Sequence, residues 1–116
     1  MHSDTRKQKT IYQVTLTRPH TVVLSTEAAL WGISQSEFLT MLLRRKLGAL
    51  SFTRPKNAPS YPFANEEFRE SERYAWYLPD QDVEKFEAER LRDGKVSASR
   101  WVMATLNDWV GWSRDA

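Results

Sequence analysis

Cysteine is absent from the sequence, and histidine occurs only twice, as His2 and His20. The missing cysteines exclude disulfides and thiol catalysis, and two histidines alone do not make a metal site. There is no glycine-rich phosphate loop and no nucleophile–base pair, so we expect neither an enzyme nor a cofactor. No apolar run approaches the roughly 20 residues that cross a bilayer, and no signal-peptide core is present. We therefore expect a cytoplasmic protein with no membrane partner.

The composition is that of one folded domain with an uneven charge distribution. The chain has 116 residues, of which 41% are hydrophobic and 12% aromatic, which suffices for a core. Residues 1–50 hold seven Lys/Arg against three acids, and residues 51–116 hold ten against twelve. The basic excess includes Arg6, Lys7 and Lys9, which precede the first predicted strand. We interpret residues 1–10 as a basic arm that reaches phosphates, with an ordinary solvated tail as the alternative.

Residues 11–48 read as strand, helix, helix. Apolar and polar residues alternate from Tyr12 to Thr17, which predicts a strand with one buried face. Pro19 fits the first turn of a helix that ends near Trp31, before Gly32. Ser34 and Glu37 have the spacing of a capping box at the start of the second helix. Its apolar face comprises Phe38, Leu39, Leu42, Leu43 and Leu47. For the cations at 44–46 we favour stabilisation of the helix dipole.

The same layout recurs in residues 73–112. A strand ends at Leu78, and the spacing from Leu78 to Gly94 equals the spacing from Leu16 to Gly32. Each residue of the first copy up to Gly32 therefore corresponds to the residue 62 positions later. Beyond Gly32 the corresponding residue lies 63 positions later, because the second copy has one extra residue there. Between strand and glycine, residues 80–93 predict an acidic helix with a solvated charged face. Its apolar positions are Val83, Phe86 and Leu91, and those of the last helix, which starts at Ser97, are Trp101, Val102, Leu106, Trp109 and Val110.

Residues 49–72 connect the two copies. They contain three prolines and no helical periodicity, but they are too aromatic for a free linker. We expect part of this connector to pack on the domain as an ordered loop, with a short helical turn over residues 66–70. The aromatic residues concerned are Phe52, Tyr61, Phe63 and Phe68.

A lone strand is unstable, so we expect the two strands to pair with each other. Antiparallel pairing of residues 11–17 with 73–78 gives a two-stranded ribbon over four helices, a mainly α fold with pseudo-twofold symmetry. The predicted buried face of the ribbon comprises Tyr12, Val14, Leu16, Tyr74, Trp76 and Leu78.

This layout resembles the ribbon-helix-helix family of DNA-binding proteins, which includes the Arc, CopG and MetJ repressors. The resemblance lies in Leu16–Gly32 followed by Ser34 and Ser36, and in Leu78–Gly94 followed by Ser97 and Ser99. Family members are usually homodimers, so two copies on one chain imply a pseudo-dimeric monomer. Two different halves can then read two different DNA half-sites.

The resemblance implies a ribbon face in the major groove of double-stranded DNA and helix N-termini against its phosphates. Tyr77 is larger than the residue the family usually has there. A solvated sheet face and simple capping serines are the alternatives, and the acidic helix should face away from DNA. The candidate base contacts are Gln13, Thr15, Thr17, Arg73, Ala75 and Tyr77. The candidate phosphate contacts are Arg6, Lys7, Lys9, Ser34, Gln35, Ser36, Ser97, Ala98, Ser99 and Arg100.

Among single-chain members, the segments KQKTIYQVTLTRP and SQSEFLTMLLRRKLG are similar to the VirC-class virulence proteins of Agrobacterium. Those proteins bind overdrive DNA beside T-DNA borders, which implies an accessory role in conjugation-like DNA transfer, with other transfer proteins as partners. It also implies that residues 1–116 are the folded part of a longer protein. A plasmid copy-number or partition repressor is the alternative. An antitoxin-type interaction module is a third possibility, although only Ser113, Arg114, Asp115 and Ala116 follow Trp112 to bind a partner.

Overall fold

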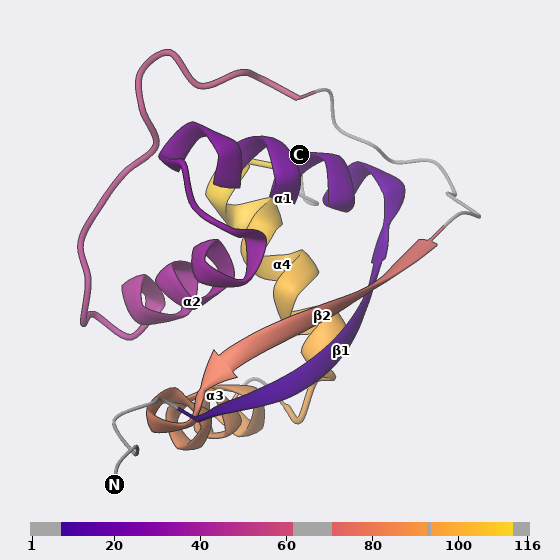
Figure 1. Cartoon of the computed structure of the whole chain (residues 1–116), viewed down its shortest axis with the longest axis vertical. Coiled ribbons are helices and arrows are strands. Elements are labelled where there is room, and N and C mark those ends of the chain that lie inside the picture. Colours follow the sequence, from indigo (N-terminus) through magenta and orange to yellow (C-terminus); the bar gives the residue numbers. More distant parts are fainter. Residues whose placement is uncertain (1–7, 62–70, 93, 113–116) are drawn as a thin grey trace, which may run out of the picture.

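The two predicted strands pair with each other. The structure, a computed structural model, describes residues 8–61, 71–92 and 94–112. Strand β1 (Lys9–Thr17) and strand β2 (Ser71–Pro79) form a two-stranded antiparallel sheet that runs diagonally across Figure 1. The register places Gln13 opposite Ala75 in the middle of the ribbon. The predicted antiparallel ribbon is confirmed, and both strands begin slightly earlier in the chain than expected.

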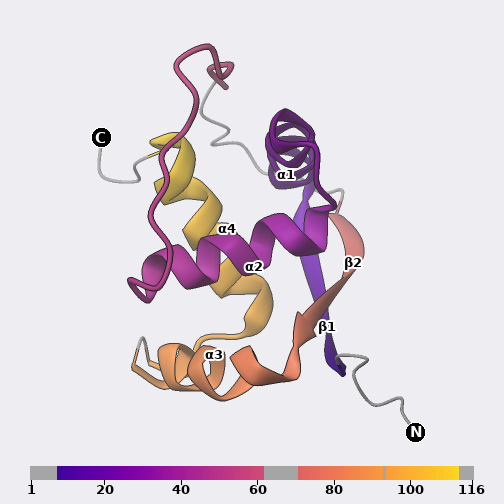
Figure 2. The ribbon, with the colours of Figure 1, turned by 60° about the vertical axis from the view of Figure 1, so that its left-hand side comes forward.

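Four helices complete the fold, and each lies where a helix was predicted. They are α1 (Arg18–Trp31), α2 (Gln35–Lys46), α3 (Asp80–Arg92) and α4 (Ala98–Val110). In Figure 2 the helices lie to one side of the ribbon. Helix α2 packs mainly on β2, whereas α4 packs mainly on β1, so each strand rests on a helix distant in sequence. The described residues thus form a mixed α/β fold of four helices and one ribbon.

Local signals set the ends of the first two helices. Gly32 ends α1 in the left-handed conformation, with φ of 68°, which favours glycine because it has no Cβ. The Ser34 hydroxyl accepts a hydrogen bond from the Glu37 amide at 3.1 Å, and the Glu37 carboxylate accepts one from the Ser34 amide at 3.1 Å. This reciprocal pair confirms the predicted capping box.

The inner face of the ribbon forms the core together with the helices. Val14, Leu16, Trp76 and Leu78 are buried as predicted, because alternate side chains of a strand point to the same face. Trp76 stacks on the Trp101 ring at 5.9 Å between centroids, and Phe86 meets both rings edge-on. The other predicted inward residues, Tyr12 and Tyr74, are only partly buried. The Tyr12 hydroxyl lies at the edge of the core, where it donates a hydrogen bond to the Glu87 carboxylate at 2.5 Å.

Helix α3 corrects two expectations. Its charged residues are not merely a solvated face, because Asp82 and Glu89 are only 5% and 3% exposed. Its predicted apolar position Leu91 is 58% exposed. The cause is helical phase, since each residue turns by about 100° and Leu91 therefore lies about 140° from the buried Phe86. Asp82 and Glu89, one turn to either side of Phe86, share its buried face instead.

The cations at the end of α2 do more than stabilise a helix dipole. The Arg44 guanidinium binds both carboxylate oxygens of Asp82, with Nε–Oδ1 and Nη2–Oδ2 distances of 3.2 and 2.7 Å. Arg45 lies over the Trp109 ring at 5.0 Å, and Lys46 lies 5.9 Å from the Trp101 centroid. These contacts join α2 to α3 and α4, which was not expected from the sequence.

Part of the connector packs on the domain, as predicted. Phe52 meets Trp31 and Trp109, and Tyr61 meets Trp112 edge-on. Both aromatic residues lie against the core. The predictions for Phe63, Phe68 and the turn at 66–70 fall outside the described residues.

The His20 imidazole makes the stability of the fold dependent on pH. Its Nδ1 lies 2.6 Å from the Thr17 hydroxyl, and its Nε2 lies 2.8 Å from Asn107 Oδ1. Burial lowers the pKa of His20 below its ordinary value of 6.5, and the hydrogen bond to Asn107 only partly opposes this. The unfolded chain therefore binds more protons as the pH falls through 6.5, so folding is favoured above this pH and loses stability below it.

We expect the free energy of unfolding to fall between about pH 7.5 and pH 5.5 in the wild type. His20→Gln, which does not titrate, should remove this decrease. Urea unfolding at several pH values above about 5 measures it while Glu27 remains ionised. An unchanged pH dependence in His20→Gln would show that other groups cause it.

Candidate nucleic-acid interface

The outer face of the ribbon presents most of the predicted base contacts to solvent. Gln13, Thr15 and Arg73 are exposed, since they alternate with the buried residues of the two strands. Thr15 lies opposite Arg73, and Tyr77 lies opposite Ile11. Ala75 is half-exposed, opposite Gln13. No described helix covers this face (Figure 2).

Thr17 differs from the other predicted base contacts. It is the N-cap residue of α1, and its hydroxyl accepts from the His20 amide at 3.4 Å. The same hydroxyl lies 2.6 Å from His20 Nδ1, and its side chain is half-buried. This hydroxyl therefore caps α1, a role that was not predicted from the sequence.

Ser36 and Ser99 hold the helix N-termini against the edges of the ribbon. The Ser36 hydroxyl accepts from the Tyr77 amide at 3.0 Å, and the Ser99 hydroxyl accepts from the Thr15 amide at 2.8 Å. Ser36 also donates to the Ala75 carbonyl at 3.4 Å. The two serines, predicted as phosphate contacts, thus bond to the backbone of the strands and fix the position of each helix start beside the outer face.

The two helix starts have the same cap but opposite charge. Ser34 caps α2, and the Ser97 hydroxyl caps α4 by accepting from the Arg100 amide at 3.1 Å. The third residue after the cap is Glu37 in α2 and Arg100 in α4, and both are exposed. The first amides of a helix have no acceptor within it and attract anions, so the α4 start is the more favourable for a phosphate.

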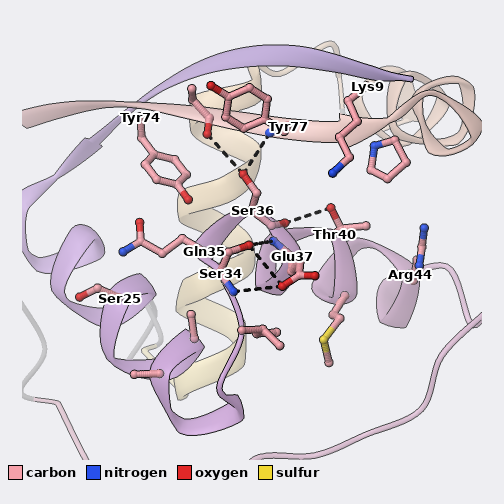
Figure 3. Close-up of a pocket in the computed structure, with 16 residues that line it drawn as sticks. Lys9, Ser25, Ser34, Gln35, Ser36, Glu37, Thr40, Arg44, Tyr74 and Tyr77 are labelled. Carbon is pink, nitrogen blue, oxygen red and sulfur yellow. Dashed lines mark hydrogen bonds between the residues drawn. The ribbon is translucent and has the colours of Figure 1, made fainter. Parts of the chain in front are cut away.

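A groove of about 1080 Å³ lies between the ribbon and helices α1 and α2. Its lining includes predicted phosphate and base contacts on its two sides, and the Lys9 and Tyr74 side chains point from the ribbon toward α2 (Figure 3). The lining holds the Lys9 and Arg44 cations and the Glu37 carboxylate, so a phosphate beside the ribbon would be bound at the Lys9 side, where the ammonium lies on a flexible stem. The predicted contacts in the lining are Lys9, Ser34, Gln35, Ser36, Ala75 and Tyr77.

Of the remaining predicted contacts, Ala98 is the first residue of α4, beside the Ser97 cap. Arg6 and Lys7 lie outside the described residues. Within residues 8–61, 71–92 and 94–112, no three His, Asp or Glu side chains gather into a possible metal site. In the same part of the chain, the longest helices fall short of what a membrane span requires.

The buried carboxylate of Glu27, which is fully inaccessible to solvent, was not predicted from the sequence. Arg54 binds it through Nε at 3.0 Å and Nη2 at 2.7 Å, while the Tyr61 hydroxyl and Trp109 Nε1 donate at 2.7 and 2.8 Å. Burial alone would raise the pKa of Glu27, but these donors outweigh it and hold the pKa below its ordinary value. Burial and the bond to Glu27 raise the pKa of Tyr61 to about 12. This cluster ties the connector residues Arg54 and Tyr61 to helices α1 and α4.

Comparison of the chain with family models, curated proteins and solved structures found no match.

Proposed function

We propose that this chain is a sequence-specific double-stranded DNA-binding protein that inserts the β1–β2 ribbon into the major groove. The observation that carries the proposal is the ribbon's outer face, where Gln13, Thr15 and Arg73 are exposed between two helix starts. A two-stranded ribbon fits the major groove, in which glutamine pairs with adenine, arginine with guanine and threonine with a base or a thymine methyl group. The helix starts, bonded to the ribbon edges, would bind the flanking phosphates.

The proposal includes a tandem ribbon-helix-helix architecture, in which the halves are related by a pseudo-twofold axis through the ribbon. The central cross-strand pair supports it, because the step along the chain from Gln13 to Ala75 equals the step from Leu16 to Leu78. A twofold axis that passes through the ribbon exchanges the two strands, so the residues next to the axis must be equivalent positions of the two copies. Gln13 and Ala75 meet this requirement.

Two sets of equivalent positions support the same architecture. The bond from the Tyr77 amide to Ser36 has its counterpart in the bond from the Thr15 amide to Ser99, with both partners exchanged between the copies. Glu27 and Glu89 also occupy equivalent positions of the repeat, and both are buried carboxylates in the first helix of their half. The halves would then form one pseudo-dimeric monomer, and folding would not depend on protein concentration.

The proposed biological role follows from the resemblance to the VirC-class proteins. It is that of an accessory factor, which binds DNA near a transfer origin and promotes T-DNA or conjugative transfer. A plasmid copy-number or partition repressor would use the same ribbon face, so its DNA contacts would be the same. The two roles differ in where the bound site lies, beside a transfer border or within a promoter. The antitoxin-type module is the alternative that does not need the ribbon to enter the groove.

A DNA titration at several salt concentrations tests the proposal with three single variants. We expect Gln13→Ala and Arg73→Ala to lose discrimination between sequences by about 1–3 kcal/mol per lost base pair contact. Lys9→Ala should weaken binding to all sequences alike and reduce the salt slope by about one unit, because it removes one phosphate contact. Electrophoretic mobility or fluorescence anisotropy with specific and scrambled duplexes measures both effects.

The pattern of losses decides the outcome. If Gln13→Ala and Arg73→Ala weaken the binding of every DNA sequence equally, the two strands do not contact bases specifically. A wild-type protein that binds no duplex at low salt would contradict the proposed function altogether.

A further inference from the structure

The ribbon's outer face has two chemically different ends. At one end Thr15 lies opposite the exposed Arg73, and both can hydrogen bond to base edges. At the other end Ile11 lies opposite Tyr77, and these two large side chains, one aliphatic and one a phenol ring, are 53% and 47% exposed. The Gln13–Ala75 pair separates the two ends. Large hydrophobic side chains that are exposed next to each other on neighbouring strands mark a surface suited to contact with a binding partner.

The charges of the flanking helix starts follow the same division. The Thr15 end is bonded to the start of α4, which carries Arg100 in its first turn and no acid. The Tyr77 end is bonded to the start of α2, which carries Glu37. One end of the interface thus carries Arg73 and Arg100, whereas the other end presents the Ile11 side chain and the Tyr77 ring beside Lys9 and the Glu37 carboxylate.

We infer that the protein binds an asymmetric site in a single orientation, with guanine under the Arg73 end and thymine methyl groups under the Ile11–Tyr77 end. The inference rests on the proposed DNA-binding function. Arginine forms two hydrogen bonds to the O6 and N7 atoms of guanine, whereas apolar side chains distinguish thymine by its C5-methyl group. A pseudo-symmetric ribbon with these unlike ends cannot make equal contacts with the two halves of a palindrome.

The alternative assignment of the two ends is chemically worse. Guanine under Ile11 would place its polar major-groove edge against an aliphatic side chain that replaces none of its water hydrogen bonds, and the Tyr77 hydroxyl can donate only one. A thymine run under Arg73 would leave the guanidinium with fewer base acceptors. Reversing the protein on the site therefore loses contacts at both ends, and this difference fixes the orientation.

The experiment begins with selection of binding sites for the wild-type protein from random duplexes. The chain has no cysteine, so one introduced thiol can carry a DNA-cleaving reagent at a known position. Ser71→Cys places the reagent at the Arg73 end, and Gln8→Cys places it at the opposite end of the ribbon. We expect Ser71→Cys to cut the guanine-containing half of the selected site and Gln8→Cys to cut the thymine-containing half.

Base analogues then test the chemistry of each end. Replacing a contacted thymine by deoxyuracil, which lacks the methyl group, should weaken wild-type binding about fourfold per methyl group. Ile11→Ser should lose this sensitivity while it retains sensitivity to 7-deazaguanine in the other half. Arg73→Ala should show the reverse pattern, with a loss of about tenfold in discrimination of guanine.

The outcomes separate the two proposals. A selected palindrome, or equal cutting of both halves by each reagent, would overturn the inference and leave DNA binding in place. Insensitivity of the wild type to deoxyuracil and 7-deazaguanine would also overturn it. If selection enriches no sequence, sequence-specific DNA binding itself fails, and the inference fails with it.

Discussion

Glu27→Gln should lower the free energy of unfolding by about 3–5 kcal/mol, the usual cost of breaking a buried ion pair by removing one partner. The Glu27 carboxylate is completely buried, and all its hydrogen-bond partners are donors from Arg54, Tyr61 and Trp109. A carboxylate accepts with both oxygens, whereas a glutamine of the same shape has only one acceptor oxygen. Its NH₂ group would face donors, and the Arg54 charge would lose its counter-charge.

Glu84→Gln is the matched control, because Glu84 is exposed on α3 and the chemical change is the same. We expect that variant to change stability by less than about 0.5 kcal/mol. Urea unfolding at neutral pH, monitored by tryptophan fluorescence and circular dichroism, gives both values. A loss below about 1 kcal/mol in Glu27→Gln would show that the buried Glu27–Arg54 pair contributes little to the stability of the fold.

Much of the fold could be predicted because its signals are local. The alternation in residues 12–17 predicts a strand whatever lies around it, and Gly32 and the Ser34–Glu37 pair mark helix ends through short-range hydrogen bonds. The pairing of β1 with β2 followed from an elementary requirement, since neither strand had another partner in the sequence. These predictions did not depend on knowing the tertiary contacts.

The buried charges could not be predicted because their partners lie far away in sequence. Glu27 is bonded by Arg54 and by Trp109, 27 and 82 positions away, and Asp82 is bonded by Arg44, 38 positions away. A sequence pattern assigns such acids to a solvated face, because burial of a charge is unfavourable without a partner. The repeat carries one signal of this burial, since Glu27 and Glu89 occupy equivalent positions in the two copies.

The candidate interface was predicted unevenly for the same reason. Exposure of Gln13 and Arg73 follows from alternation alone. The hydroxyls of Ser36, Ser99 and Thr17 were assigned to DNA, yet each already has a partner within the fold. Which acceptor or donor a serine meets depends on the approach of the helix start to the strand, a tertiary distance that no spacing in the sequence specifies.

Gln13→Glu should reduce DNA affinity about 100-fold without unfolding the protein. Gln13 is exposed in the middle of the ribbon's outer face, so its replacement by a side chain of the same shape leaves the core unchanged. In the bound state, the variant would lose the glutamine–adenine hydrogen bonds and place a carboxylate in the negative field of the groove. A loss of about 2.8 kcal/mol corresponds to this factor of 100.

Asn57→Asp supplies the matched control, since it also converts an exposed amide into a carboxylate. Asn57 lies in the connector, which Figures 1 and 2 both show away from the outer face of the ribbon. Asn57→Asp and Gln13→Glu change the net charge of the protein by the same amount, so a general effect of protein charge would weaken the DNA binding of both variants alike. We expect Asn57→Asp to bind DNA within about twofold of the wild type, because exposed charges beyond a Debye length are screened.

The opposite charge at the same position distinguishes contact from structural damage. Gln13→Lys should strengthen binding to duplexes of any sequence and steepen the salt dependence by about one unit, because the new ammonium reaches a phosphate. Discrimination between sequences should fall, since lysine cannot make the paired hydrogen bonds of glutamine to adenine. If neither variant differs from Asn57→Asp, the ribbon face is not where DNA binds. If both weaken binding equally, the charge at position 13 does not act on DNA phosphates and the predicted electrostatic effect is wrong. Opposite effects of the two charges at one exposed position have no explanation in a disturbed fold, because both side chains project away from the core.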